Sequence, residues 1–230
     1  MTTLPFSLAI APTTTQFLLT VEGTPAAADR EKQRQAHNMV AGSDEAVAGA
    51  RSFGDLSHAA YIPTGPGASD NKLLFIDFWN SVDGIMKFFS NPQVQEGGKL
   101  VFKERESVVW APSPGLPRVN LPGPTGRTER YLGIVKGPIA SKADAEKLLM
   151  EATRNALNGN RAKGLLSREW FFRADKPDAM EAIGVDVWFD ADGMQAVYAD
   201  PAEMQPLANL FTARPVTSVW AKPQGQWVEW

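Results

Sequence analysis

The sequence contains no cysteine and only two histidines, His37 and His58, in 230 residues. The absence of cysteine excludes disulfides, iron–sulfur clusters, cysteine-ligated zinc and thiol nucleophiles. With so few histidines, a zinc site would need a carboxylate-rich ligand set, which is uncommon. We therefore expect no metal site.

The usual local signatures of catalysis are also missing. The sequence has no glycine-rich phosphate loop, no His-Glu-x-x-His and no Gly-x-Ser-x-Gly elbow. A formal net charge of -3, without a long basic run, predicts neither nucleic acid nor a membrane surface as a partner. No apolar run approaches the roughly 20 residues of a membrane-spanning helix. The first residues carry no basic group before their short apolar stretch, unlike a secretory signal, so we expect a cytoplasmic protein.

An internal repeat is the strongest positive signal. The segment 75–84 aligns with 184–193, so that Asp77 matches Asp186 and Trp79 matches Trp188, 109 residues further on. Because short solenoid repeats run about 20–50 residues, this long period indicates a tandem duplication of a domain. Fused copies usually face each other, and we expect function in the cavity that they enclose.

Each copy has the same predicted order of elements, which is strand, helix, strand, strand, helix, strand. The first copy has strands at 17–22, 57–62, 73–79 and 106–111, with helical segments at 26–39, 44–50, 82–89 and 93–103. The second has strands at 131–136, 167–173, 183–188 and 217–221, with helical segments at 141–157 and 192–211. This order is the ferredoxin-like βαββαβ unit of an α+β protein. We place the first repeat at 1–111, a Pro/Gly-rich linker at 112–128 and the second repeat at 129–230.

The alternation of residues in strand 73–79 separates two faces. Leu74, Ile76 and Phe78 are suited to lie under the helices. Phe75, Asp77 and Trp79 are then expected to face the cavity between the two sheets. The repeat gives Gly184, Asp186 and Trp188 the same placement. An acid beside an indole, in both copies, predicts a partly polar cavity.

Hairpin symmetry adds a partner to each aspartate. A turn centred between Gly67 and Ala68 places His58 opposite Asp77, and a turn centred at Pro177 places Arg168 opposite Asp186. His58 and Arg168 are themselves equivalent under the repeat, because they lie 110 residues apart. Two routes therefore place an ionisable or cationic group beside each aspartate.

These pairs differ in their chemistry. An imidazole held by a carboxylate has a fixed tautomer and can act as a general base, so His58 and Asp77 are candidate catalytic residues. Arg168 with Asp186 can hold an anionic or phenolic oxygen of a substrate. The alternative is that both are structural ion pairs that bridge two strands.

The remaining candidates are aromatic residues and the second histidine. Trp79 and Trp188 are candidates to line a substrate pocket, or else they belong to the core. His37 lies in a polar helical segment, and we expect it to be a solvated surface residue.

The segment 75–95 resembles the third strand and second helix of the dimeric α+β barrel superfamily, which includes antibiotic biosynthesis monooxygenase-like domains. The segment 185–205 shows the same pattern of a strand ending near tryptophan, an acidic helix start and a polar-Pro step. The resemblance implies that the two copies form, within one chain, the barrel that single-domain relatives form as dimers. It also implies an oxygenase without a cofactor, acting on a small phenol-like or quinol-like substrate between sheet and helices.

Two further functions stay open. One is a barrel that binds a small aromatic ligand without catalysis. The other is a haem protein, as some superfamily members with two fused copies are, with His58 or His37 as the ligand. The superfamily's axial histidine lies in the second copy, which has no histidine here. A homodimer is also allowed, because each copy leaves edge strands.

Overall fold

The computed structural model describes residues 15–113, 115–116, 119–120, 130–176 and 178–230. The N-terminal segment and most of the predicted linker 112–128 lie outside these residues. None of the described helices is both long and apolar enough to cross a lipid bilayer.

The element order of the first half is strand, helices, strand, strand, helices, strand. Its elements are β1 (Phe17–Pro25), α1 (Arg30–Ala41), α2 (Asp44–Ser52), β2 (Asp55–Pro63), β3 (Leu73–Trp79), α3 (Val82–Ser90), α4 (Pro92–Val101) and β4 (Phe102–Pro112). Glycine at position 54 adopts φ +101° before β2, a conformation that side chains with a Cβ rarely adopt. The short strand β5 (Val119–Asn120) follows.

The second half has the same order. Its elements are β6 (Tyr131–Pro138), α5 (Lys142–Ala162), β7 (Leu165–Arg173), β8 (Glu181–Trp188), α6 (Ala191–Tyr198), α7 (Pro201–Ala208) and β9 (Val216–Ala221). Gly164, with φ +106°, precedes β7 as Gly54 precedes β2. The predicted helix 192–211 is therefore two helices, with Pro201 as the first residue of the second.

Eight antiparallel strands close into a barrel. The strand order is β4-β1-β3-β2 in the first half and β9-β6-β8-β7 in the second. The two sheets are joined by pairing of β2 with β9 and of β4 with β7, while β5 adds to β7. Because the sheet edges pair with one another, the predicted edge strands are used within the chain.

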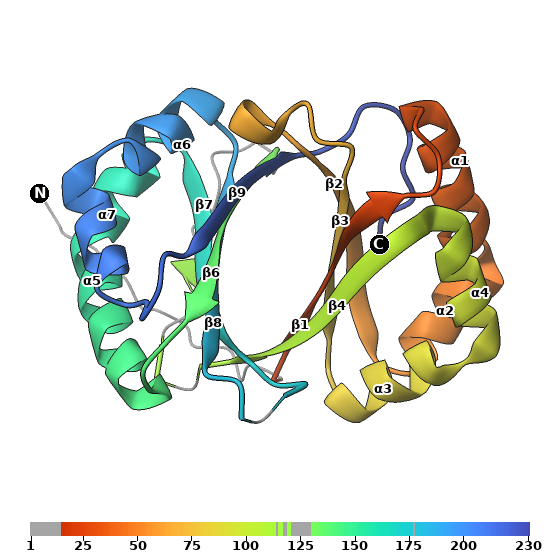
Figure 1. The fold of residues 1–230 in the computed structure, drawn as a ribbon, viewed down its shortest axis with the longest axis horizontal. Coiled ribbons are helices and arrows are strands. Elements are labelled where there is room, and N and C mark those ends of the chain that lie inside the picture. The colour runs from red at the N-terminus through yellow and green to blue at the C-terminus, as the bar shows by residue number, and fades with distance from the viewer. Residues whose placement is uncertain (1–14, 114, 117–118, 121–129, 177) are drawn as a thin grey trace, which may run out of the picture.

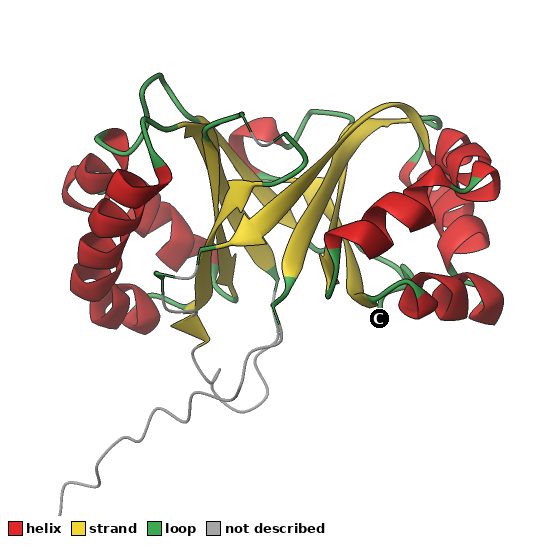
Figure 2. Cartoon of the chain, turned by 90° about the horizontal axis from the view of Figure 1, so that it is seen from below, coloured by secondary structure: helices red, strands yellow, loops and turns green. Residues whose placement is uncertain are grey.

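The helices cover the outside of the barrel, with α1 to α4 on one side and α5 to α7 on the other (Figures 1 and 2). Inside, apolar side chains from both sheets form one cluster, which includes Leu74, Ile76, Leu132, Phe171 and Val185. Separate clusters fill the space between each sheet and its helices.

The predicted assignment of the two faces of strand β3 is wrong. Leu74 and Ile76, with Phe78 packed against them, belong to the cluster inside the barrel. Phe75 and Trp79 lie under the helices, where the Trp79 ring lies 5.5 Å from that of Phe88 on α3. The interior of a small closed barrel is filled by side chains from both sheets, which favours the wholly apolar face.

Candidate functional site

Three cavities adjoin the two sheets. The barrel cavity, of about 630 Å³, lies between them. The first-half cavity, of about 420 Å³, lies between the first sheet and helices α1 to α4. The second-half cavity, of about 630 Å³, lies between the second sheet and its helices and extends to Glu22 and residues 63–72 of the first half.

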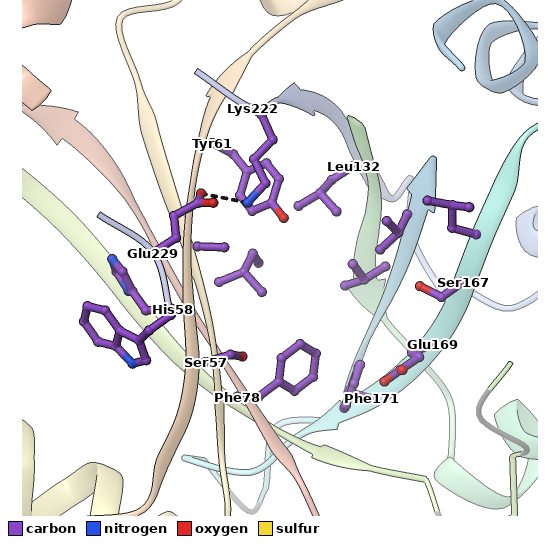
Figure 3. A pocket seen from close by; sticks show the side chains of 16 residues that line it. Ser57, His58, Tyr61, Phe78, Leu132, Ser167, Glu169, Phe171, Lys222 and Glu229 are labelled. Atoms are coloured by element: carbon purple, nitrogen blue, oxygen red, sulfur yellow. Dashed lines mark hydrogen bonds and ion pairs between the residues drawn. The ribbon is translucent and has the colours of Figure 1, made fainter. Parts of the chain in front are cut away.

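The barrel cavity is the chamber predicted from the repeat, but its lining is mostly apolar. Figure 3 shows Tyr61, Phe78, Leu132 and Phe171 around it, whereas the ring of His58 points away from it. Polar groups lie at its rim, where Lys222 forms an ion pair with Glu229 at 2.7 Å. The predicted aspartate pairs are therefore not inside the barrel, because they occupy the opposite face of their strands.

The predicted hairpin register of the first half is confirmed. His58 lies opposite Asp77 on the neighbouring strand, and its Nδ1 lies 2.6 Å from Asp77 Oδ1. Both residues are buried and line the first-half cavity under the helices.

The prediction that His37 is a solvated surface residue is wrong. His37 is only 1% exposed, and its Nε2 lies 2.8 Å from Nε2 of His58. Gln33 and His37, four residues apart on α1, are the fully buried residues of this helix. The buried positions of α1 are thus polar. A prediction based on the spacing of apolar residues therefore assigns them to the surface.

Hydrogen bonds of Asn38 fix the protonation of this cluster. Asn38 Nδ2 donates to the carbonyl of Gln226 at 2.7 Å, and its Oδ1 accepts from the backbone N–H of Val228 at 3.0 Å. The same Oδ1 lies 2.9 Å from Nδ1 of His37, which must therefore carry a hydrogen. Neutral His37 then accepts at Nε2, so the hydrogen between the two rings belongs to His58.

His58 and Asp77 share one further proton. With Nε2 of His58 protonated, the short contact from Nδ1 to Asp77 needs a second hydrogen on one of the two atoms. Burial lowers the pKa of His58, but the charge and hydrogen bond of Asp77 outweigh it, so the pKa is raised. We assign an imidazolium paired with a carboxylate. Burial, with the charge of His58, lowers the pKa of His37 to about 4, in accord with a neutral ring.

Asp55 is a further acid of the first-half cavity. Burial, together with the negative charge of Asp77, raises its pKa to about 7. Its Oδ2 accepts a hydrogen bond from Nε1 of Trp230 at 3.0 Å, while Oδ1 has no partner among the described residues.

The C-terminal segment, residues 222–230, closes this site. The backbone N–H of His58 donates to the carbonyl of Trp230 at 2.8 Å, and the indole of Trp230 stacks on the His58 ring with centroids 4.6 Å apart. Strand β2 pairs with β9 only at Ile62 and Pro63, so the segment also satisfies backbone groups that this edge would leave unpaired.

The predicted register of the second half is also confirmed, and its pair lies under the helices as well. Arg168 lies opposite Asp186 and donates from Nε at 2.8 Å and from Nη2 at 2.7 Å to the two carboxylate oxygens. Tyr198 on α6 donates to Asp186 at 3.0 Å and accepts from Nε1 of Trp188 at 3.3 Å. Burial raises the pKa of Tyr198 well above its usual value, and the Asp186 charge adds to this.

The structure does not bring all predicted site residues together. His58, Asp77 and Trp79 line the first-half cavity, whereas Arg168 and Asp186 line the second-half cavity. Arg168 therefore does not hold a substrate next to His58, because the barrel lies between them. Trp188 is fully buried in the core between sheet and helix α6.

Sequence reasoning missed His37, Asp55, Tyr198 and Trp230 as parts of these clusters. Tyr198 lies 109 residues after Phe89, so the repeat could have marked it as the polar member of an aromatic pair. The role of Trp230 depends on the path of the C-terminal segment, for which the sequence carries no signal.

The described residues hold no group of three or more histidine, aspartate or glutamate side chains suited to a metal ion. The sequence matches no family model and no curated protein. Solved structures are similar in fold. A protein assigned as a monooxygenase from Lactobacillus acidophilus NCFM has a TM-score of 0.59 at 13% identity, with 92% of this chain and 97% of that chain covered.

Two other similar structures have different names. An anthrone oxidase-like protein has a TM-score of 0.59 at 11% identity, with 91% of this chain and 92% of that chain covered. A chlorite dismutase variant from Candidatus Nitrospira defluvii has a TM-score of 0.58 at 14% identity, with 93% of each chain covered. The chain therefore has the dimeric α+β barrel fold, as the resemblance of segments 75–95 and 185–205 predicted.

Proposed function

We propose that the chain is a monooxygenase-like oxidoreductase that binds a small phenol or quinol in the first-half cavity. The observation that carries this proposal is the chain of hydrogen bonds from Asp77 through His58 to His37, in the wall of a cavity lined by aromatic rings. These rings include Phe75, Trp79, Phe88, Phe89 and Phe102. Flat apolar walls with a few convergent polar groups are typical of sites for aromatic ligands.

The positive charge of His58 indicates how this residue would act on a bound phenol. In the free protein its Nε2–H donates to neutral His37, which is a weaker acceptor than a phenolate oxygen. A bound phenol that takes the place of His37 would be stabilised as its anion by the imidazolium, which Asp77 holds in position. The phenolate is the electron-rich form, which dioxygen oxidises more readily than the neutral phenol. Because His58 already holds a proton on each ring nitrogen, the proton of the phenol leaves to solvent, and His58 acts as the hydrogen-bond donor that stabilises the anion instead of the general base predicted from sequence.

The overall reaction balances with dioxygen as the only co-reactant. One oxygen atom enters the substrate as a carbonyl, and the other leaves as water with the two hydrogen atoms that the substrate loses. The resemblance to monooxygenase-like domains supports this class, and so do the names of two structural neighbours.

The residues present do not fit a haem group. An axial histidine in the second half is not available, since the sequence has histidine only at positions 37 and 58. Both ring nitrogens of His37 and of His58 take part in hydrogen bonds. In the second half, the hydroxyl of Tyr198 is held by Asp186 and Trp188.

Oxygen uptake with a panel of quinols and anthrones tests the proposal. We expect uptake by the wild type, a loss of about 100-fold in His58→Gln, typical of removing a group that stabilises a reacting anion, and a smaller loss in Asp77→Asn. Tyr198→Phe in the other half is the matched control and should keep full activity.

A barrel that only binds ligands gives a different pattern. In that case calorimetry would detect phenol binding to the wild type, without oxygen uptake on any substrate of the panel. Retained uptake in His58→Gln would contradict the assigned site, even if the chain proved to be an oxygenase.

We also propose that the chain arose by duplication, with repeats at 1–111 and 129–230 joined by the linker 112–128. The shared element order and the two equivalent aspartate pairs support this division.

A further inference from the structure

The second-half cavity is not used by the proposed oxidation, although it is larger than the first-half cavity. Its walls are apolar and partly aromatic, with Val135, Trp170, Met194 and Leu207 among them. Arg168 and Asp186 provide its charged groups on the sheet side. A concave, largely apolar cavity with few polar groups is the usual form of a small-molecule site.

Arg168 has one group of donors without a partner. Its Nε and Nη2 atoms donate to Asp186, but no acceptor in the described part of the chain receives a hydrogen bond from Nη1. The side chain of Arg168 is only 10% exposed. Because the guanidinium is planar and held at two points, the direction of Nη1 is fixed. A ligand oxygen that reaches Nη1 from the cavity would gain a hydrogen bond to a charged donor in largely apolar surroundings.

The electrostatics of the site favour an uncharged acceptor. Asp186 neutralises Arg168, and Glu203 adds a second negative charge to its surroundings. At another part of the wall, the positive charges of Lys72 and Lys136 are balanced by Glu22, with which they pair at 3.0 and 3.3 Å, and by Asp70. A carboxylate or phosphate would therefore lose its hydration without meeting net positive charge.

We infer that the second-half cavity binds an uncharged aromatic ketone or quinone, whose carbonyl oxygen accepts a hydrogen bond from Nη1 of Arg168. The rings of the ligand would pack against the apolar wall that Trp170 and Leu207 supply. This site is independent of the oxidation proposed for the first half, because it uses none of the same side chains.

Calorimetric titration with three flat probes tests the inference. Fluorenone carries a carbonyl, fluorene lacks it, and fluorene-9-carboxylate carries a charge instead. We expect fluorenone to bind about tenfold more tightly than fluorene, the size of one hydrogen bond to a charged donor. We expect the carboxylate to bind no better than fluorene.

Two variants place the effect in this cavity. Arg168→Met combined with Asp186→Leu removes both partners of the buried pair, a change that proteins often tolerate, and should reduce the fluorenone preference to about one. Leu207→Trp fills the cavity and should weaken fluorenone and fluorene alike. His58→Gln alters only the first half and should preserve the preference.

Four results would overturn the inference. In the first, fluorenone binds no more tightly than fluorene, and in the second, fluorene-9-carboxylate binds more tightly than fluorene. In the third, none of the probes binds, and in the fourth, the double variant still prefers fluorenone to fluorene. If the double variant fails to fold, the Leu207→Trp variant and the ratios in the wild type still decide the outcome.

Discussion

The two buried ion pairs occupy the same place in the two halves, yet they differ in what they can do. His58 with Asp77 shares a proton and passes its hydrogen bond on to a third group, His37. Arg168 with Asp186 is permanently charged, and the guanidinium is held through Nε and Nη2. The comparison shows that one cross-strand position can hold a proton-sharing pair in one half and a permanently charged pair in the other.

The surroundings of the pairs differ in a compensating way. The neighbouring cross-strand pair is Ala60 with Phe75 in the first half and Trp170 with Gly184 in the second. Each half thus places one large ring under its helices, but on opposite strands. A Cβ at Gly184 would lie 2.7 Å from the Trp170 ring, so the large residue requires the glycine.

A second exchange explains the different polarity. Leu19 lies opposite Asp77, whereas Gly133 lies opposite Asp186. A Cβ at Gly133 would lie 1.7 Å from the hydroxyl of Tyr198, so only glycine leaves room for it. In the first half, Phe89 lies 109 residues before Tyr198 and lacks that hydroxyl.

The equivalent tryptophans Trp188 and Trp79 also differ in the hydrogen bonding of their indole nitrogens. Trp188 donates to Tyr198, whereas Nε1 of Trp79 has no partner among the described residues.

The largest expected effect separates the two pairs by removing one partner of each. Arg168→Met should lower the free energy of unfolding by about 3–5 kcal/mol, because Asp186 is left as a buried charge without its guanidinium. Asp77→Asn should cost about 1–3 kcal/mol, since His58 can release its proton and become neutral. Urea unfolding followed by circular dichroism measures both. Equal losses would show that the two pairs are electrostatically alike.

An intermediate effect tests the exchange of Leu19 for Gly133. Gly133→Ala should cost about 2 kcal/mol, because its methyl group displaces the Tyr198 hydroxyl from Asp186. Tyr198→Phe alone should cost about 1 kcal/mol, and the double variant should lose less than the sum of the two. Strictly additive losses in a double-mutant cycle would refute this coupling.

Local patterns predicted much of this fold and the partners in both pairs. Strand 73–79 has the predicted bounds, and hairpin symmetry placed His58 and Arg168 correctly, because register depends on local pairing. The facing direction was not predictable in the same way. Alternation separates two faces of a strand, but both faces of β3 are buried, so burial alone cannot tell barrel from helix layer.

The groups around the pairs depend on contacts between distant segments. His37 reaches His58 only because α1 presents a polar stripe to the sheet, and Asn38 is oriented by residues about 190 positions away. Composition and periodicity contain no information on such contacts.

The smallest expected effect is the change of the free energy of unfolding per pH unit. It concerns the titratable groups of the first-half cavity. Between pH 4 and 6.5 the unfolded chain binds a proton at His37 that the folded chain does not, because the folded pKa is about 4. Stability from this group therefore rises with pH. Asp55 acts oppositely, since its folded pKa of about 7 makes the folded chain bind the extra proton. The two contributions offset each other in the wild type.

Substitution of either Asp55 or His37 should reveal the pH dependence of stability that the other group contributes. In Asp55→Asn the free energy of unfolding should rise with pH between 4 and 6.5, by at most about 1.4 kcal/mol per pH unit relative to the wild type. In His37→Gln it should fall by a similar amount. Above pH 6.5 the wild type itself should lose stability, because the raised pKa of His58 makes the folded chain bind the extra proton there.

Tyr198→Phe is the matched control for these profiles, because the raised pKa of Tyr198 keeps its hydroxyl neutral throughout this range. Urea unfolding across the pH range measures the slopes of all three variants. Parallel profiles for Asp55→Asn and His37→Gln would show that the two groups do not titrate as opposites. The first-half cluster would then not differ from the Arg168–Asp186 pair in how its contribution to stability depends on pH.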